Sequence, residues 1–192
     1  MTTFDDIPVD PLYTLAMDVP HSWLVRPRES LYDLDNIQLS ALSAEERERG
    51  VEAIFELDYL VIEGHAREIL VNQPPRGLQM QLTTLDGSPV DDTQVVLNLG
   101  YLQLKAKPGV YGLEIREGRG RDIYEMESVG NEGWASPSVS ESGNEITVTS
   151  LEGLTLYPQV KRRLGMEKAD VLAEFVVADE EGGGIFGDLA SR

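Results

Sequence analysis

The sequence predicts an all-β fold: an antiparallel β-sandwich with one or two short helices and a disordered, acidic, glycine-rich C-terminal tail. Three observations predict this class. Apolar and polar residues alternate with a period of two in several short segments, which is typical of strands buried on one face. Turn-forming residues separate these segments at short intervals, as in sandwiches and barrels. Few segments carry the apolar stripe that a packed helix requires.

The alternating segments predict the half-buried strands, at residues 78–83, 101–105, 113–116 and 146–149. In the first of them, Leu78, Met80 and Leu82 fall on one face of an extended chain. Two longer apolar runs, at 53–62 and 95–99, predict strands that are buried more completely.

Helices are expected to be few and short. Ser43 and Glu46 have the spacing of a capping box. The charged residues that follow offer no apolar face, so one or two polar turns are expected there. Residues 166–175 predict another short helix, with apolar residues partly on one side.

Composition divides the chain into three parts. Residues 1–10 are predicted to be a disordered lead-in, residues 11–175 the β-sandwich region, and residues 176–192 a flexible linker. The sequence alone does not decide whether the first strands belong to a neighbouring sandwich. If residues 12–25 normally pair with such a neighbour, the chain exposes an unpaired strand and is expected to self-associate.

Charge and composition exclude several classes of function. The chain has 34 acidic and 16 basic residues, a formal charge of −18, and 41% hydrophobic residues. Nucleic acid is excluded as a partner and an anionic membrane is disfavoured, because both attract positively charged proteins. The absence of cysteine excludes disulfides, thiolate metal sites and thiol catalysis. The sequence shows no signal peptide, retention signal or membrane-spanning run.

Two motifs suggest chemistry that their context does not support. The sequence GGGIFG at 182–187 has the spacing of a dinucleotide-binding loop, but too few residues follow it here for the helix and strand of such a site. It is interpreted as part of the linker. Asp33 and Asp35 could chelate a divalent metal beside a diphosphate. The favoured interpretation places them on the polar side of a strand whose Leu34 points inward.

The two histidines, His21 and His65, are too few for a zinc site with three histidines. His65 lies near Glu63 and Glu68 in the sequence, which would suit proton transfer. The glycine before it favours a bulge or a strand end instead. No side chain is therefore assigned as catalytic, cofactor-binding or metal-binding.

The candidate contact residues are Trp134, Arg119 and Arg121. Trp134 lies in the loop sequence NEGWASP, where an exposed ring could stack on a sugar or an apolar peptide, although a packed anchor is the favoured interpretation. Arg119 and Arg121 form the only local basic cluster, which is expected to tighten a hairpin and to pair with nearby acids. Trp23 lies in an apolar context and is expected in the core.

Several runs, taken in order, resemble the UDP-glucose:glycoprotein glucosyltransferase family over about residues 11–172. They are DVPHSWLV at 18–25, YDLDN at 32–36, PPRGLQ at 74–79 and NLGYLQLKA at 98–106. The resemblance implies β-sandwich structure between thioredoxin-like domains and a C-terminal catalytic domain. The family enzyme transfers glucose from UDP-glucose to high-mannose glycans of misfolded glycoproteins in the endoplasmic reticulum lumen, and its catalytic domain uses Ca²⁺ or Mn²⁺.

The same resemblance implies a noncatalytic module. The metal-binding Asp-x-Asp of the family lies in the catalytic domain, so that role is not transferred to Asp33 and Asp35. The chain is expected to be a fragment that is inactive alone and carries no cofactor. Its expected partners are the other domains of the enzyme and misfolded glycoprotein clients.

Two alternatives belong to other classes. The first is an independent carbohydrate- or peptide-binding sandwich that uses Trp134 or the Arg119–Arg121 turn as its contact. The second is a metal-dependent hydrolase that uses Asp33 and Asp35.

Overall fold

Strands make up most of the regular structure, which confirms the all-β class with antiparallel sheets. A computed structural model describes residues 1–173. In this part of the chain the order of elements is β1 (Leu12–Tyr13), β2 (Trp23–Ser30), β3 (Ile37–Gln38), η1 (Leu39–Ala41), α1 (Ala44–Arg49), β4 (Ala53–His65), β5 (Arg67–Glu68), β6 (Gln79–Thr83), β7 (Pro89–Gln94), β8 (Tyr101–Ala106), β9 (Gly109–Ile115), α2 (Arg119–Ile123), β10 (Tyr124–Ser128), η2 (Gly133–Ala135), α3 (Val139–Ser142), β11 (Glu145–Val148), β12 (Leu154–Leu156) and β13 (Gln159–Arg162).

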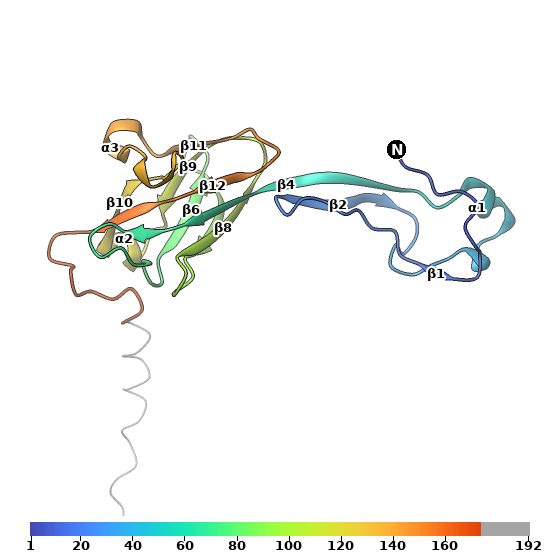
Figure 1. Cartoon of the computed structure of the whole chain (residues 1–192), viewed down its shortest axis with the longest axis horizontal. Helices are drawn as coiled ribbons and strands as arrows, with labels where there is room; N and C mark the ends of the chain where they lie inside the picture. The colour runs from blue at the N-terminus through green and yellow to red at the C-terminus, as the bar shows by residue number, and fades with distance from the viewer. Residues whose placement is uncertain (174–192) are drawn as a thin grey trace, which may run out of the picture.

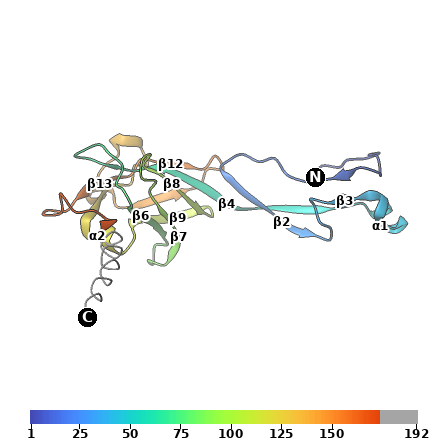
Figure 2. The ribbon, with the colours of Figure 1, turned by 90° about the horizontal axis from the view of Figure 1, so that it is seen from below.

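A long arm projects from the rest of the molecule (Figures 1 and 2). It is built on β2, which pairs antiparallel with the first part of β4. The β1–β3 ladder and α1 lie at its far end (Figure 1). We call residues 1–58 the arm. Of these residues only Ser22 and Ile37 are buried, so the arm has almost no core of its own.

The capping box predicted for α1 is confirmed at the far end of the arm. The Glu46 backbone N–H donates to Ser43 Oγ at 3.2 Å, and the Ser43 backbone N–H donates to Glu46 Oε2 at 2.8 Å. These two bonds satisfy N–H groups that the first turn of a helix otherwise leaves unpaired. They explain how a helix without any buried residue begins at Ala44.

The remaining strands form the body, in which the sheets enclose one hydrophobic core. The first sheet has the order β11-β9-β6-β7, the second β12-β4-β2 with β8 along the other edge of β4, and the third β10-β13-β5. All three sheets contribute to the core, whose buried residues include Leu60, Ile62, Met80, Leu82, Leu102, Leu104, Leu113, Tyr124, Ile146, Leu156 and Val160. Strand β4 therefore belongs to the arm at its beginning and to the core at its end.

The four alternating segments are confirmed as strands, in β6, β8, β9 and β11. The prediction for the run 95–99 is wrong, because it forms a turn in which Val96, Leu97 and Leu99 are exposed. The strand in this region is β7, which lies just before it. The run 53–62 is a strand as predicted, but its first half belongs to the arm and is half-exposed.

Two local predictions need correction. Residues 166–172 form turns and irregular structure rather than a helix; Ala173 is helical, and the last two residues of the predicted helix lie outside the described part. Between β9 and β10 the chain forms α2 rather than a hairpin, because these strands belong to different sheets. The described part has three short α-helices, so helices are few and short as expected. Two ladders, β12–β4 and β13–β5, are parallel within otherwise antiparallel sheets.

The expected unpaired edge over residues 12–25 is partly wrong. Leu12 and Tyr13 pair with β3, and residues 23–25 pair with β4, within the same chain. The linker at 176–192, with the glycine-rich motif at 182–187, lies outside the described residues. The boundaries drawn at residues 10 and 175 remain predictions.

Candidate functional site

Four aromatic side chains form a row on the outer face of the sheet that contains β8, β4 and β12. The rings of Tyr101 and His65 meet edge to face with centroids 5.6 Å apart. His65 stacks on Tyr157 at 6.3 Å, and Tyr157 meets Trp134 edge to face at 5.0 Å. We call these four residues the aromatic row. Such offset and edge-on arrangements are those that aromatic pairs prefer.

Strand alternation and register explain how the row forms. Leu60, Ile62 and Gly64 of β4 are buried, so His65 points away from the core. Tyr101 is the direct cross-strand partner of His65. On the other side, β12 runs parallel to β4 with its last residue opposite Gly64, which brings the next residue, Tyr157, beside His65.

Trp134 completes the row from the short 3-10 helix η2 and is held there by its own backbone. Gly130 and Gly133 have positive φ angles of 75° and 84°, which turn the chain after β10 back over the sheet. Gln159 Nε2 then donates to the Trp134 carbonyl at 2.8 Å, and the Arg67 guanidinium lies 4.8 Å from the centre of the indole ring. Trp134 as a whole residue remains 40% exposed, so it is both anchored and accessible.

Polar groups lie directly beside the rings. The Tyr101 hydroxyl donates to Glu63 Oε1 at 3.1 Å. Burial, and then the hydrogen bond to the Glu63 carboxylate, raise the pKa of Tyr101 above its usual value, so the hydroxyl stays protonated. Glu63 also borders a shallow pocket whose lining includes His21, Glu152 and Thr155.

A second polar cluster is buried, where Glu68, Tyr124 and Arg162 meet. Arg162 Nε donates to both Glu68 carboxylate oxygens, at 3.0 and 3.2 Å, and the Tyr124 hydroxyl donates to Glu68 Oε2 at 3.2 Å. Burial and the Glu68 carboxylate raise the pKa of Tyr124 to about 12. Arg162 also donates to the carbonyls of Met166 and Ala169. This cluster ties the turns that follow β13 to the core.

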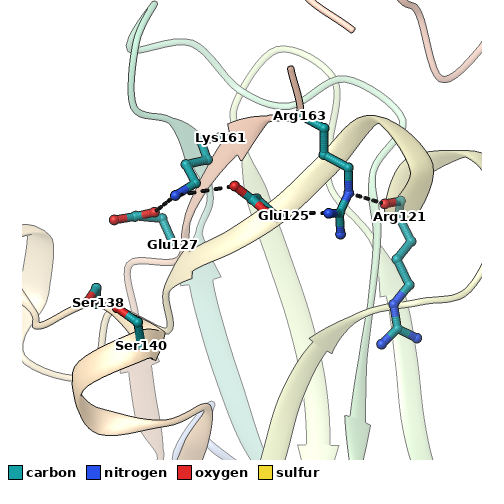
Figure 3. Close-up of polar contacts among 7 residues, drawn as sticks. All are labelled: Arg121, Glu125, Glu127, Ser138, Ser140, Lys161 and Arg163. Carbon is teal, nitrogen blue, oxygen red and sulfur yellow. Dashed lines mark hydrogen bonds and ion pairs between the residues drawn. The ribbon is translucent and has the colours of Figure 1, made fainter. Parts of the chain in front are cut away.

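The structure places Arg119 and Arg121 away from the aromatic row. Arg119 Nε donates to the Asp170 carbonyl at 2.8 Å, and Arg121 forms an exposed ion pair with Glu117 at 3.7 Å. Figure 3 shows the Arg121 carbonyl accepting a 3.0 Å bond from Arg163 Nε. These contacts lie at the Arg162 end of the β10–β13 ladder, whereas Trp134 contacts Gln159 at its other end. The proposed contact residues therefore do not form one site.

The polar side chains in the same region form exposed ion pairs. Figure 3 shows Lys161 Nζ bridging Glu125 at 3.2 Å and Glu127 at 2.8 Å, while Arg163 reaches Glu125 at 3.4 Å. Ser138 and Ser140 share a hydrogen bond of 2.8 Å nearby. Exposed pairs of this kind contribute little to stability individually.

Asp33 and Asp35 lie in a turn rather than on a strand, which corrects the earlier interpretation. The Asp35 backbone N–H donates to Asp33 Oδ1 at 3.2 Å, and the Asn36 backbone N–H donates to the Asp33 carbonyl at 3.1 Å. Both carboxylates are exposed, and Leu34 is half-buried. Within residues 1–173 no group of three or more histidine, cysteine or acidic side chains is placed to hold a metal ion.

Trp23, expected in the core, packs against it from the base of the arm. Its indole N–H donates to the Leu151 carbonyl at 2.6 Å. None of the helices in the described part of the chain is long and apolar enough to span a membrane.

Sequence reasoning singled out Trp134 but missed the other members of its site. Alternation gave the orientation of Tyr101 within its strand. No local signal joins Tyr157, Arg67 and Trp134, because their proximity depends on the parallel pairing of β12 with β4 and of β13 with β5.

Comparison with known proteins identifies related sequences. A family model described as UDP-glucose:Glycoprotein Glucosyltransferase matches residues 63–173. The chain is 39% identical over 179 residues to UDP-glucose:glycoprotein glucosyltransferase 1 of Homo sapiens and 37% identical over 175 residues to the UDP-glucose:glycoprotein glucosyltransferase of Drosophila melanogaster. These alignments cover 93% and 91% of the chain. The chain spans 11% of the length of each of these relatives.

Proposed function

Because this chain belongs to the UDP-glucose:glycoprotein glucosyltransferase family, we propose that it forms a noncatalytic β module of such an enzyme. The observation that carries the proposal is the family match itself, which coincides with the body of the structure. Residues 63–173 contain most of the buried core, and Leu60, Val61 and Ile62 of β4 lie just before the matched segment. A closed body of this kind is suited to holding neighbouring domains at a fixed distance.

The arm supports a role in assembly. The arm exposes large apolar residues, namely Leu12, Met17, Leu24, Leu31, Ile54 and Leu57, with exposed fractions between 37% and 85%. Apolar surface of this extent is usually covered in the working form of a protein. The chain spans only 11% of the length of its relatives. We propose that other parts of the family enzyme cover the arm.

The body also has a firm attachment for the segment that follows β13. Arg162 and Arg119 hold the carbonyls of Met166, Ala169 and Asp170. Leu172 packs so closely on Gly77 that a Cβ at Gly77 would lie 2.7 Å from the Leu172 side chain. A segment fixed at several points fixes the direction of the chain at residue 172. We propose that this orients the part of the enzyme that follows.

The enzyme as a whole would transfer glucose from UDP-glucose to high-mannose glycans of misfolded glycoproteins in the endoplasmic reticulum lumen. UDP-glucose and the Ca²⁺ or Mn²⁺ that supports its chemistry would bind in the catalytic domain rather than to this chain. Misfolded glycoprotein clients would be partners of the assembled enzyme.

A chimera tests the proposal. The aligned segment of the human relative is replaced by residues 1–173, and glucose transfer to a denatured glycoprotein is measured for the chimera and for the isolated chain. We expect transfer by the chimera and none by the isolated chain. Transfer by the isolated chain, or a folded chimera without activity, would overturn the proposal.

Arm variants of the same chimera test the assembly role. Ile54→Asp with Leu57→Asp should lower its yield and thermal stability, because both side chains would be buried against other domains. Gln38→Asp, which adds a charge at an exposed polar position of the arm, is the matched control. Equal stability of the two variant chimeras would refute the packing of the arm.

A further inference from the structure

We propose that the aromatic row and the polar side chains behind it form a binding site for a neutral oligosaccharide. This proposal is independent of the assembly role above. The ligand would be an extended run of pyranose units lying across β8, β4 and β12 toward Trp134. This binding site would take no part in glucose transfer.

The rings are arranged as a row rather than as a compact cluster. They come from β8, from β4, from the residue after β12 and from η2, with successive centroids 5.6, 6.3 and 5.0 Å apart. Tyrosine and tryptophan combine an apolar ring with a polar edge, and they suit ligands that have apolar faces and polar rims. A pyranose has this character, with C–H groups on its faces and hydroxyl groups around its rim. A row of rings offers one stacking position after another to a chain of such units.

A second row supplies hydrogen-bonding groups next to the rings. Gln103 of β8 is opposite Glu63 of β4, and Thr155 of β12 lies on the other side of Glu63. Gln103 and Thr155 are exposed. Beyond the rings, Gln159 and Arg67 lie against Trp134. Amide, hydroxyl and carboxylate groups can exchange hydrogen bonds with sugar hydroxyls at both edges of the row.

Charge and composition favour a neutral ligand over the other classes. The chain carries a charge of −18, yet Glu63 and Arg67 balance one another beside the row. No excess of positive charge is present there to attract an anionic chain. The outward side chains of β8 are Tyr101, Gln103 and Lys105, so this strand presents no exposed aliphatic group that an apolar peptide would cover. Exposed aliphatic side chains such as Leu97 and Leu99 lie in the loop before β8 instead.

Titration of the full chain with neutral oligosaccharides tests the site. The probes are maltohexaose, mannopentaose and chitopentaose, with a sulfated oligosaccharide and an apolar peptide as competing classes. Binding is followed by calorimetry and by NMR of the two indole N–H groups. We expect saturable binding of at least one neutral probe and a shift of the Trp134 signal. The Trp23 signal should not move, because that N–H is bonded to the Leu151 carbonyl.

Variants locate the site. Trp134→Ala and His65→Ala should each weaken binding about tenfold or more, since stacking contacts are lost. Phe4→Ala removes an aromatic ring that is 67% exposed outside the row and should leave binding unchanged. Circular dichroism shows whether each variant is folded. If Trp134→Ala does not fold, the NMR shifts of the wild-type protein still locate the bound ligand. Failure of all neutral probes to bind, binding of only the sulfated or peptide probe, or shifts remote from the row would each overturn the proposal.

Discussion

Two glycines with similar positive φ angles should respond very differently to substitution by alanine. Gly130 and Gly87 have φ angles of 75° and 86°. An L-residue with a φ angle in this range costs about 1–2 kcal/mol, so both substitutions should destabilise the chain by about that amount. They differ in the space available for a Cβ. At Gly87 there is no atom within 4 Å of the added Cβ.

At Gly130 the added Cβ would lie 2.1 Å from both the carbonyl carbon and the oxygen of Tyr157. These are backbone atoms, so rotation of a side chain cannot relieve the overlap. Separating them would disturb the 3.0 Å bond from the Tyr157 N–H to the Gly130 carbonyl. Overpacking costs about 1–3 kcal/mol and a lost hydrogen bond about 0.5–1.5 kcal/mol. Gly130→Ala should therefore destabilise the chain by about 2–4 kcal/mol more than Gly87→Ala.

Urea unfolding, followed by circular dichroism, measures both free energies of unfolding on the full chain. The midpoint should fall much further for Gly130→Ala than for Gly87→Ala. Tyr157 lies in the aromatic row, so near-ultraviolet dichroism should also change only in Gly130→Ala. Two variants that differ by less than about 0.5 kcal/mol would refute the reasoning, because the backbone conformation alone would then explain both costs.

Two further predictions concern the buried cluster. Glu68→Gln should lower the free energy of unfolding by about 3–5 kcal/mol, because it leaves Arg162 without its charge partner in a mostly buried setting. Glu56→Gln, which weakens an exposed pair with Arg26, should cost about 0.2–1 kcal/mol; equal costs in urea unfolding would contradict the assigned role of burial. The folded state raises the pKa of Tyr124 from 10.0 to about 12, so its contribution is complete below pH 10 and is lost between pH 10 and about 12. Unfolding measured across this range should show a loss of about 2–3 kcal/mol that Tyr124→Phe lacks, and equal pH dependence of both proteins would disprove it.

Strands with one buried face could be predicted because alternation records burial directly. Leu78, Met80 and Leu82 are all fully buried, as the pattern required. The run 95–99 shows where composition fails. Its apolar residues form a turn that ends at Gly100, whose φ is 70° and whose Cβ would lie 2.5 Å from the Ala66 carbonyl oxygen. The requirement for that close approach is tertiary, so hydrophobicity alone could not show it.

The candidate site could be predicted only in part for a related reason. A lone loop tryptophan suggested stacking, and Trp134 is indeed 40% exposed. The other rings of its row are distant in sequence, and the parallel ladder between β12 and β4 brings them together. Periodicity gives the face on which a residue lies within its own strand. It carries no information on which strand becomes the neighbour.

In the arm, the burial of a side chain also depends on tertiary structure. Strand β4 is apolar along most of its length, yet Ile54 is 44% exposed whereas Leu60 and Ile62 are fully buried. These side chains are chemically alike, and they differ because the other sheets cover only the second half of the strand. The body does not cover Ile54 and Leu57, so these apolar residues are exposed to solvent in the isolated chain. Their burial by another protein surface would be favourable. The exposed apolar residues in the first half of β4 therefore favour the proposal that the arm is completed by other parts of the family enzyme.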